Sequence, residues 1–196
     1  MNSASTPTLV LASTSPFRKE LLGRLNLPFE TAAPDVDESR LDNEPAAKLV
    51  RRLSEAKARA IGATRSGLII GSDQVATHCD TILGKPGDHA TATRQLRQLS
   101  GEHVIFLTGL CLLDSKTNEV QLDVVPFSVV FRELDDEQIE RYLRQDQPYN
   151  CAGSFKSEGL GITLFERMAG DDPTALIGLP LIRLTGMLAS AGISLP

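Results

Sequence analysis

The chain has 196 residues, of which 41% are hydrophobic and 23% charged, and its formal net charge is −5. This composition is typical of a globular protein, and a chain of this length buries roughly 70% of the surface that its unfolded form exposes. Proteins that bind duplex nucleic acid cluster many lysines and arginines on one surface, which an acidic chain does not favour. A small phosphorylated ligand needs only one basic pocket. We therefore expect a small-molecule ligand and no nucleic-acid polymer as partner.

The cysteines and the apolar segments indicate where the protein works. Cys79, Cys111 and Cys151 lie far apart without a C-x-x-C pair, which predicts reduced thiols in the cytoplasm and no zinc site. The first eight residues lack the basic and apolar regions of a secretion signal. The most apolar stretch, residues 176–195, contains Arg183, so it predicts a buried helix and no membrane span.

Hydrophobic periodicity predicts a series of strands and helices in alternation. In chain order we expect a strand at 9–12, a helix from 16, a strand at 29–33, a polar turn segment at 34–44, a helix at about 45–63 and a strand at 68–71. A turn or hairpin at 80–87, a helix at 88–99, strands at 103–113 and 121–131, a helix at 135–145, a loop at 153–161, a strand at 162–166 and helix from 173 follow. This mixture predicts a single α/β domain over residues 1–196.

The first polar cluster follows the first strand. Ser13, Thr14 and Ser15 lead into a proline and then Arg18. A helix that begins in hydroxyls presents free backbone N–H groups to an anion, and a guanidinium in its first turn suits phosphate. The other interpretation is an ordinary helix cap with a surface arginine.

The second and third clusters are acidic. Asp35, Asp37 and Glu38 follow the second strand, and Asp73 stands at the end of the predicted strand 68–71. Magnesium takes one or two carboxylates together with substrate phosphates. Asp73 could ligate that metal, act as general base for a water, or serve only as a structural cap. A solvated acidic loop is the other interpretation of the second cluster.

Two lysines and one loop complete the candidates. Lys57 interrupts the alanine-rich face of a predicted helix, and Lys85 lies in a Gly-Lys-Pro turn. Either ammonium could balance phosphate charge, although an isolated lysine is more often a solvated one. The glycine-flanked segment 152–159 carries an aromatic, a lysine and Glu158, which could hold a nucleobase or form a plain turn.

Taken in order, these segments resemble the Maf nucleotide pyrophosphatases. The matching motifs are Leu-Ala-Ser-Thr-Ser-Pro-Phe-Arg (11–18), Val-Asp-Glu (36–38), Ala-Lys-Ala (56–58), Ile-Gly-Ser-Asp-Gln-Val (70–75), Gly-Lys-Pro (84–86), Thr-Gly (108–109), Ala-Gly-Ser-Phe-Lys-Ser-Glu-Gly (152–159) and Gly-Leu-Pro (178–180). The resemblance covers nearly the whole chain, and several independent segments in one order make chance a poor explanation.

The resemblance implies a two-lobed α/β fold with a mixed sheet, helices on the outside and a deep central cleft, similar to the inosine-triphosphate pyrophosphatases. It also implies a divalent metal (Mg²⁺ or Mn²⁺), a frequent homodimer and release of diphosphate from a nucleoside triphosphate. Carried over by motif, the proton acceptor is Asp73, the other catalytic polar residues are Glu38, Lys57 and Lys85, the metal ligands are Glu38 and Asp73, and the phosphate-binding residues are Ser13 and Arg18.

Three positions separate the two branches of the family, one acting on dTTP and UTP and the other on 7-methyl-GTP. Phe17, Gln74 and Glu158 match the second branch, although its members often carry Trp where Phe17 stands. Methylation at N7 makes guanine cationic, so stacking on Phe17 would contribute about 0.5–2 kcal/mol, and Glu158 could accept hydrogen bonds from the base.

Other interpretations stay open at this point. Phe17 could instead be a core residue of the first helix. The enzymatic alternative is a dTTP/UTP pyrophosphatase. The non-enzymatic one is a nucleotide-sensing regulator of septum formation, which would bind nucleotide without turnover.

Overall fold

The computed structural model describes residues 7–79 and 81–196. The first six residues, which hold most of the segment predicted not to be a secretion signal, and Asp80 of the predicted hairpin lie outside them. The elements are β1 (Leu9–Ala12), α1 (Pro16–Gly23), β2 (Phe29–Ala32), α2 (Ala46–Gly62), β3 (Leu68–His78), β4 (Thr81–Leu83), α3 (His89–Leu99), β5 (His103–Asp114), β6 (Val120–Phe131), α4 (Asp136–Asp146), the 3-10 turns η1 (Ala152–Ser154) and η2 (Leu160–Leu164), β7 (Phe165–Ala169), α5 (Pro173–Ile177) and α6 (Leu181–Ser190).

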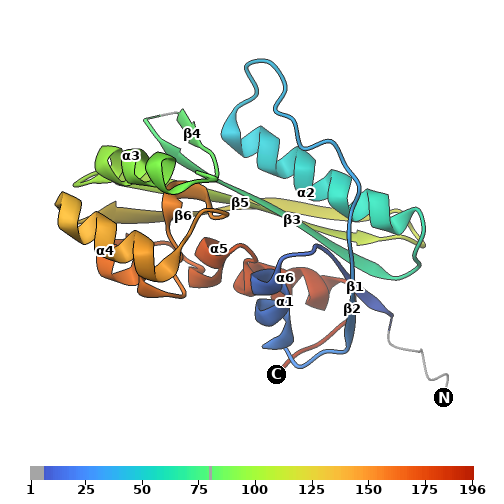
Figure 1. Cartoon of the computed structure of the whole chain (residues 1–196). Coiled ribbons are helices and arrows are strands. Elements are labelled where there is room, and N and C mark those ends of the chain that lie inside the picture. The colour runs from blue at the N-terminus through green and yellow to red at the C-terminus, as the bar shows by residue number, and fades with distance from the viewer. Residues whose placement is uncertain (1–6, 80) are drawn as a thin grey trace.

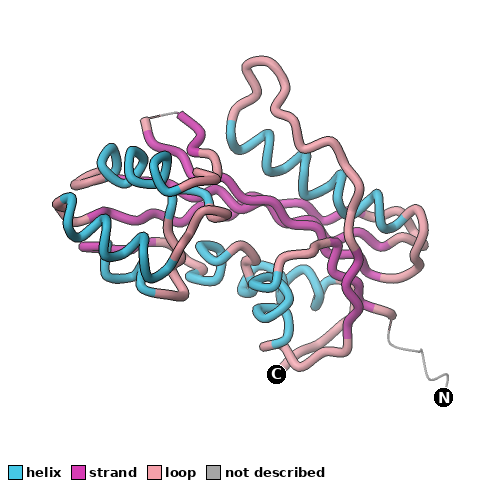
Figure 2. Tube along the Cα trace, viewed as in Figure 1, coloured by secondary structure: helices cyan, strands magenta, loops and turns pink. Residues whose placement is uncertain are grey.

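A seven-stranded mixed sheet runs through the molecule in the order β2-β1-β3-β5-β6-β7, with β4 paired to β3 (Figures 1 and 2). β1 pairs in parallel with β2 and β3, whereas β3, β5, β6 and β7 pair antiparallel. The long strands β3, β5 and β6 link the end that carries α1 to the end that carries α3 and α4. This arrangement confirms the predicted mixed α/β fold; the single domain over residues 1–196 stays a prediction.

Helices cover both faces of the sheet (Figure 1). α2 lies on one face over β3 and β5, and α5 and α6 lie on the other. Two large groups of buried apolar side chains result. One contains residues of α3, α4, the first half of β5 and the second half of β6. The other contains residues of α1, α6 and β1. Of the described residues, no helix is both long and apolar enough to cross a membrane.

The helix α2 lies unusually close to the sheet because two glycines face it. A Cβ added at Gly71 of β3 would stand 2.1 Å from the carbonyl oxygen of Ser54, and one at Gly109 of β5 would stand 2.2 Å from that of Val50. Only a residue without a side chain leaves room for the helix backbone at these two points. The glycines therefore set the height of α2 above the sheet.

Two predicted boundaries are wrong. The strand expected at 162–166 is instead the 3-10 turn η2 followed by β7, because a short apolar run does not distinguish a buried turn from a strand. The strand expected at 68–71 continues to His78, so Asp73 lies within β3 and not at its end. β5 pairs with β3 along this whole length, and a long-range partner can extend a strand through polar residues.

We expect Gly109→Ala to destabilise the fold by about 1–3 kcal/mol, because the added methyl group forces α2 away from the sheet. Gly186→Ala is the matched control, since an added Cβ in α6 meets nothing within 4 Å and alanine is the better helix former. Denaturant unfolding of both variants measures the difference. A Gly109→Ala protein as stable as the wild type would contradict the close approach.

Candidate functional site

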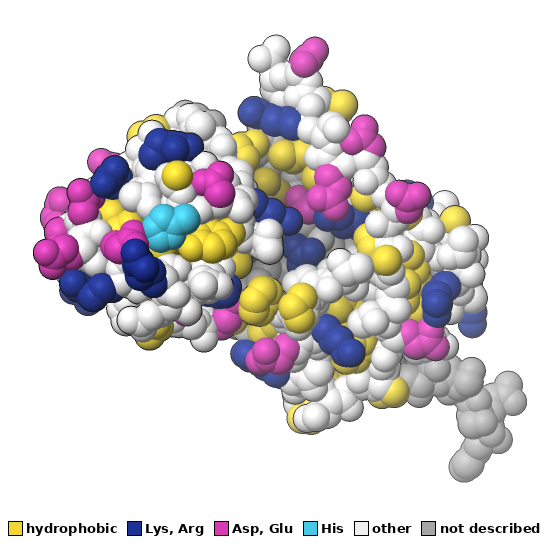
Figure 3. All heavy atoms as spheres, viewed as in Figure 1, with side chains coloured by type: hydrophobic (Ala, Val, Ile, Leu, Met, Phe, Trp, Pro, Cys, Tyr) yellow, Lys and Arg dark blue, Asp and Glu magenta, His cyan; other side chains and the backbone are white. Residues whose placement is uncertain are grey.

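A cleft of about 700 Å³ opens between the part built on α1 and α2 and the part that carries α3 and α4. Figure 3 shows this hollow with lysine, arginine and acidic side chains gathered in it. Its lining includes eight of the nine predicted site residues: Ser13, Phe17, Arg18, Glu38, Lys57, Asp73, Gln74 and Lys85. The ninth, Glu158, lines only the adjoining pocket.

The centre of the cleft is a lysine held between two carboxylates. The Lys57 Nζ lies 2.7 Å from Oδ1 of Asp73 and 2.8 Å from Oε1 of Glu38. The side chains of Lys57 and Asp73 are 7% and 11% exposed, whereas that of Glu38 is 58% exposed. A buried ammonium is stable only when it is paired, so this lysine has a definite partner in Asp73 and is not a solvated surface residue.

The position of Lys57 follows from the helix that carries it. The buried residues of α2 recur at helical spacing, and Lys57 stands four residues after Leu53 and four before Ile61 on that stripe. The close approach of α2 at Gly71 and Gly109 then brings the ammonium to Asp73, which pairs with Gly109 across the sheet.

The strand β3 presents its site residues to opposite faces of the sheet, because side chains alternate along a strand. Gly71 and Asp73 face α2. Ser72 and Gln74 face α5: the Ser72 hydroxyl lies 2.9 Å from the carbonyl oxygen of Gly178, and the Gln74 amide reaches the carbonyls of α5. One strand therefore serves two compartments.

Arg18 is fixed on the α1 side of the cleft. Its Nε donates to the carbonyl oxygen of Gly178 at 2.9 Å, and its backbone N–H donates to Oγ of the helix cap Ser15 at 3.4 Å. The buried Ser13 accepts a hydrogen bond from the backbone N–H of Ser15 at 3.1 Å. The hydroxyls therefore organise this turn themselves, and the arginine keeps its terminal nitrogens for a ligand.

The charges in the cleft act on one another. Partial burial raises the pKa of Glu38, but the hydrogen bond and charge of Lys57, followed by the charges of Lys85 and Arg18, outweigh it and lower the pKa overall. Burial lowers the pKa of Arg18, and the charges of Asp73 and Glu38 oppose this effect. These mutual effects place Arg18 and Lys85 in the field of the Glu38 carboxylate.

The loop that carries Glu38 is tied to α2 by a second ion pair, which the sequence did not indicate. Arg52 donates from Nε to Oε1 of Glu44 at 2.7 Å and from Nη2 to Oε2 at 2.8 Å, and also to the carbonyl oxygen of Ser39 at 2.9 Å. Nothing in the local pattern marks Arg52 among the several arginines of this helix. A bidentate carboxylate–guanidinium pair of this kind adds geometric precision as well as energy.

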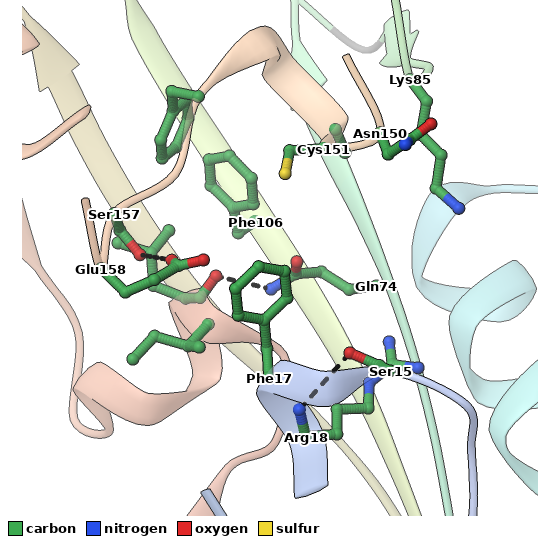
Figure 4. A pocket seen from close by; sticks show the side chains of 14 residues that line it. Ser15, Phe17, Arg18, Gln74, Lys85, Phe106, Asn150, Cys151, Ser157 and Glu158 are labelled. Atoms are coloured by element: carbon green, nitrogen blue, oxygen red, sulfur yellow. Dashed lines mark hydrogen bonds between the residues drawn. The ribbon is translucent and has the colours of Figure 1, made fainter. Parts of the chain in front are cut away.

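A narrower pocket of about 180 Å³ adjoins the cleft and contains the three predicted specificity residues, Phe17, Gln74 and Glu158 (Figure 4). Phe17 is half-buried and belongs neither to the two large groups of buried apolar side chains nor to the smaller group between α2 and the sheet, so it is not part of the core. Glu158 is exposed and accepts a hydrogen bond from the Ser157 hydroxyl at 3.3 Å.

The remaining residues of the late loop serve the fold more than the pocket. The buried Phe155 ring packs edge-to-face against Phe106, Phe131 and Phe165. Lys156 donates from Nζ to the carbonyl oxygen of Asp146 at 2.5 Å. Of the aromatic, lysine and carboxylate expected to hold a base, Glu158 alone has a free charged group there.

The carboxylates of the cleft fit a divalent metal only in part. No three His, Cys, Asp or Glu side chains of the described residues converge on one point. Glu38 and Asp73 each use one oxygen on Lys57, which leaves Oε2 and Oδ2 as donors. Magnesium usually takes one or two carboxylates and completes its shell with water and phosphate oxygens, so these two residues suit a metal that arrives with a phosphorylated ligand.

The fold and site define an α/β protein with a cleft in which two carboxylates and three cations converge beside a pocket lined by aromatic and polar side chains. The Maf-like protein family matches residues 8–191. The 7-methyl-GTP pyrophosphatase of Nitrosococcus oceani is 56% identical over 191 residues, with 97% of this chain and 96% of that protein covered. The chain therefore belongs to the Maf family.

One further relative agrees with this membership, and one solved structure shares the fold. The 7-methyl-GTP pyrophosphatase of Pseudomonas putida is 56% identical over 189 residues, with 96% of this chain and 98% of that protein covered. Among solved structures, the Ham1 protein of Staphylococcus aureus superposes with a TM-score of 0.52 at 11% identity, with 94% of this chain and 99% of that chain covered. This second likeness concerns the fold alone.

We expect Glu44→Gln to destabilise the protein at neutral pH but not at strongly acidic pH. The hydrogen bond from Arg52 is the largest cause that lowers the pKa of Glu44 to about 2. A carboxyl group with a lowered folded-state pKa contributes stability above its unfolded pKa of about 4.3, and that contribution is lost as the pH falls towards 2. Unfolding measured from pH 7 to pH 2 should show the two proteins converging, and a constant gap would contradict the role of this pair.

Proposed function

We propose that this protein is a nucleotide pyrophosphatase that hydrolyses 7-methyl-GTP to 7-methyl-GMP and diphosphate. The observation that carries the proposal is the buried Lys57 between Asp73 and Glu38, in a cleft that also holds Arg18 and Lys85. This set supplies a base for water and cations for a triphosphate. The names of relatives 56% identical over nearly the whole chain support the same reaction.

Asp73 is the proton acceptor in this proposal. Its Oδ1 is held by Lys57, so Oδ2 is the oxygen available to a water molecule. The water loses a proton to Asp73, its oxygen bonds to the phosphorus under attack, and the phosphoanhydride bond to the leaving diphosphate breaks. The fixed ammonium of Lys57 keeps the carboxylate in place during this transfer, as general-base catalysis requires.

The cations of the cleft bind the phosphates. The terminal nitrogens of Arg18 can contact a phosphate in a fork geometry while its Nε stays on Gly178. Lys85 extends from the opposite wall, on an exposed turn beside Asn150 (Figure 4). When bound at Glu38 and Asp73 with the nucleotide, Mg²⁺ or Mn²⁺ would neutralise phosphate charge. Ser13 contributes indirectly, because its hydroxyl shapes the turn that precedes α1.

The remaining expectations complete the proposal. Three free cysteines agree with a reducing compartment, so we place the protein in the cytoplasm. A homodimer is expected from the family resemblance. A dTTP/UTP pyrophosphatase and a nucleotide sensor without turnover are the alternatives that the assay below separates.

The purified protein with Mg²⁺ or Mn²⁺ should release diphosphate from 7-methyl-GTP faster than from GTP, UTP, dTTP or ITP. Asp73→Asn should lower kcat by about 10²–10⁴-fold, because the amide cannot accept the proton from water. Asp136→Asn is the matched control, since Asp136 is also ion-paired, to Arg97 at 2.7 Å, but lies on α4 outside the cleft.

The relative rates of hydrolysis of these nucleotides distinguish the three proposed functions. Preference for dTTP and UTP would keep the chemistry and overturn the base assignment. Nucleotide binding without turnover of any substrate would support the sensor, and an Asp73→Asn protein as active as the control would remove Asp73 from its role.

Phe17→Ala should reduce the preference for 7-methyl-GTP over GTP by roughly 2- to 30-fold, which corresponds to a cation–π contact of about 0.5–2 kcal/mol. Phe17→Trp should keep or increase this preference, because tryptophan is the stronger partner for a cation. The ratio of kcat/KM for the two nucleotides measures the effect. If neither substitution moves the ratio, the ring does not stack on the methylated base.

A further inference from the structure

The Gln74 amide is held in one orientation by three oxygen atoms. Its Nε2 lies 2.7 Å from the carbonyl oxygen of Ala175, 3.0 Å from that of Leu176 and 3.0 Å from Oγ1 of Thr108. If the amide were reversed, its oxygen would face two carbonyl oxygens with no hydrogen between them. The nitrogen must therefore point to α5, and Oε1 is the only polar atom of this side chain left for the pocket.

Thr108 contacts the Gln74 amide from the neighbouring strand β5. It is fully buried on β5, directly opposite Gln74 in the register of the sheet. Its hydroxyl donates to the carbonyl oxygen of Ala175 at 2.9 Å and accepts from Gln74. One hydroxyl thus joins the side chain that faces the pocket to the helix that orients it.

The acceptor helix is itself anchored. Asp172 is 2% exposed and accepts hydrogen bonds from the backbone N–H and the hydroxyl of Thr174 and from the backbone N–H of Ile182. These bonds tie the first turn of α5 to the start of α6. The carbonyl groups of Ala175 and Leu176 lie at the end of this five-residue helix, where the Ala175 oxygen also accepts from the backbone N–H of Gly178 at 3.1 Å.

The result is a pocket in which the side chains of Gln74 and Glu158 both present acceptors. Oε1 of Gln74 accepts no hydrogen bond from the part of the chain that the structure describes, and the Glu158 carboxylate offers only acceptor oxygens. In Figure 4 these two groups lie on either side of the Phe17 ring. A base that contacts both groups would offer an N–H donor to each of them.

We propose that Thr108 is a positioning residue for base specificity: its hydroxyl joins the α5 carbonyls in locking the Gln74 amide, so that Oε1 faces the pocket and favours a base with two adjacent donors, as in a 2-amino-6-oxopurine. The inference rests on the proposed function and deepens it. Hypoxanthine lacks the 2-amino donor, adenine offers an unprotonated ring nitrogen, and uracil has one N–H between two carbonyls. A pocket built to hydrogen-bond a group discriminates strongly against an analogue that lacks it.

The test compares 7-methyl-GTP with 7-methyl-ITP, which differ only in the 2-amino group. We expect the wild-type protein to favour the first by about tenfold or more in kcat/KM. Thr108→Val, which keeps the shape of the side chain but removes its hydroxyl, should lower this ratio by about threefold or more, because the amide loses one of its three partners and the Ala175 carbonyl loses a donor. Thr108→Ser should restore it. Thr77→Val, which removes a hydroxyl bonded to the carbonyl oxygen of Ile105 on the same pair of strands but outside the pocket, is the matched control.

Binding of 7-methyl-GMP and 7-methyl-IMP, measured by calorimetry on the same proteins, separates this inference from the proposed function. A selectivity that falls in Thr108→Val and returns in Thr108→Ser supports the lock, even if no triphosphate is turned over. A Thr108→Val protein that hydrolyses 7-methyl-GTP with wild-type selectivity overturns the lock and leaves the proposed function standing. Equal use of both nucleotides by the wild type would overturn the requirement for two donors.

Discussion

The close approach of α2 to the sheet is the constraint on which the site depends. Gly71 and Gly109 leave no side chain beneath the helix, and the helix backbone occupies the space instead. With the helix this close to the sheet, the Lys57 ammonium lies within hydrogen-bonding distance of both Asp73 and Glu38. Burial of a charge costs free energy unless a partner compensates it, so the pairing of Lys57 with Asp73 is a condition of folding as well as a feature of the site.

The strand β3 organises what the helix approach makes possible. Asp73 points to α2 and the charged cleft, and Gln74 points to α5 and the narrower pocket. The partners across the sheet divide in the same way, since Gly109 stands beside Asp73 and Thr108 beside Gln74. If a phosphorylated nucleoside spans both compartments, consecutive residues of one strand would therefore contact its phosphates and its base.

Three features could be predicted from the sequence because they depend on local patterns. These are the mixed fold, most element positions and the residues that line the cleft. Lys57 was recognisable as a charge on an apolar helix face, and the structure places it on the buried stripe. The Glu44–Arg52 pair and the three contacts of the Gln74 amide were not predictable. They join residues distant in the chain, and neither hydropathy nor spacing records which of several arginines or which end of an amide meets a given partner. The length of β3 was missed for the same reason, because its outer half is defined by pairing with β5.

The alternation of Asp73 and Gln74 on one strand also constrains how such a protein can diversify. Point substitutions at Gln74, or at the residues of β5 and α5 behind it, change the base compartment without moving any group on the opposite face of the sheet. Insertion or deletion of one residue in β3 is different, because a shift by one position exchanges the two faces and removes both sets of contacts together. New ligand preferences are therefore accessible through single substitutions at constant strand length, and the chemistry on the other face is inherited unchanged.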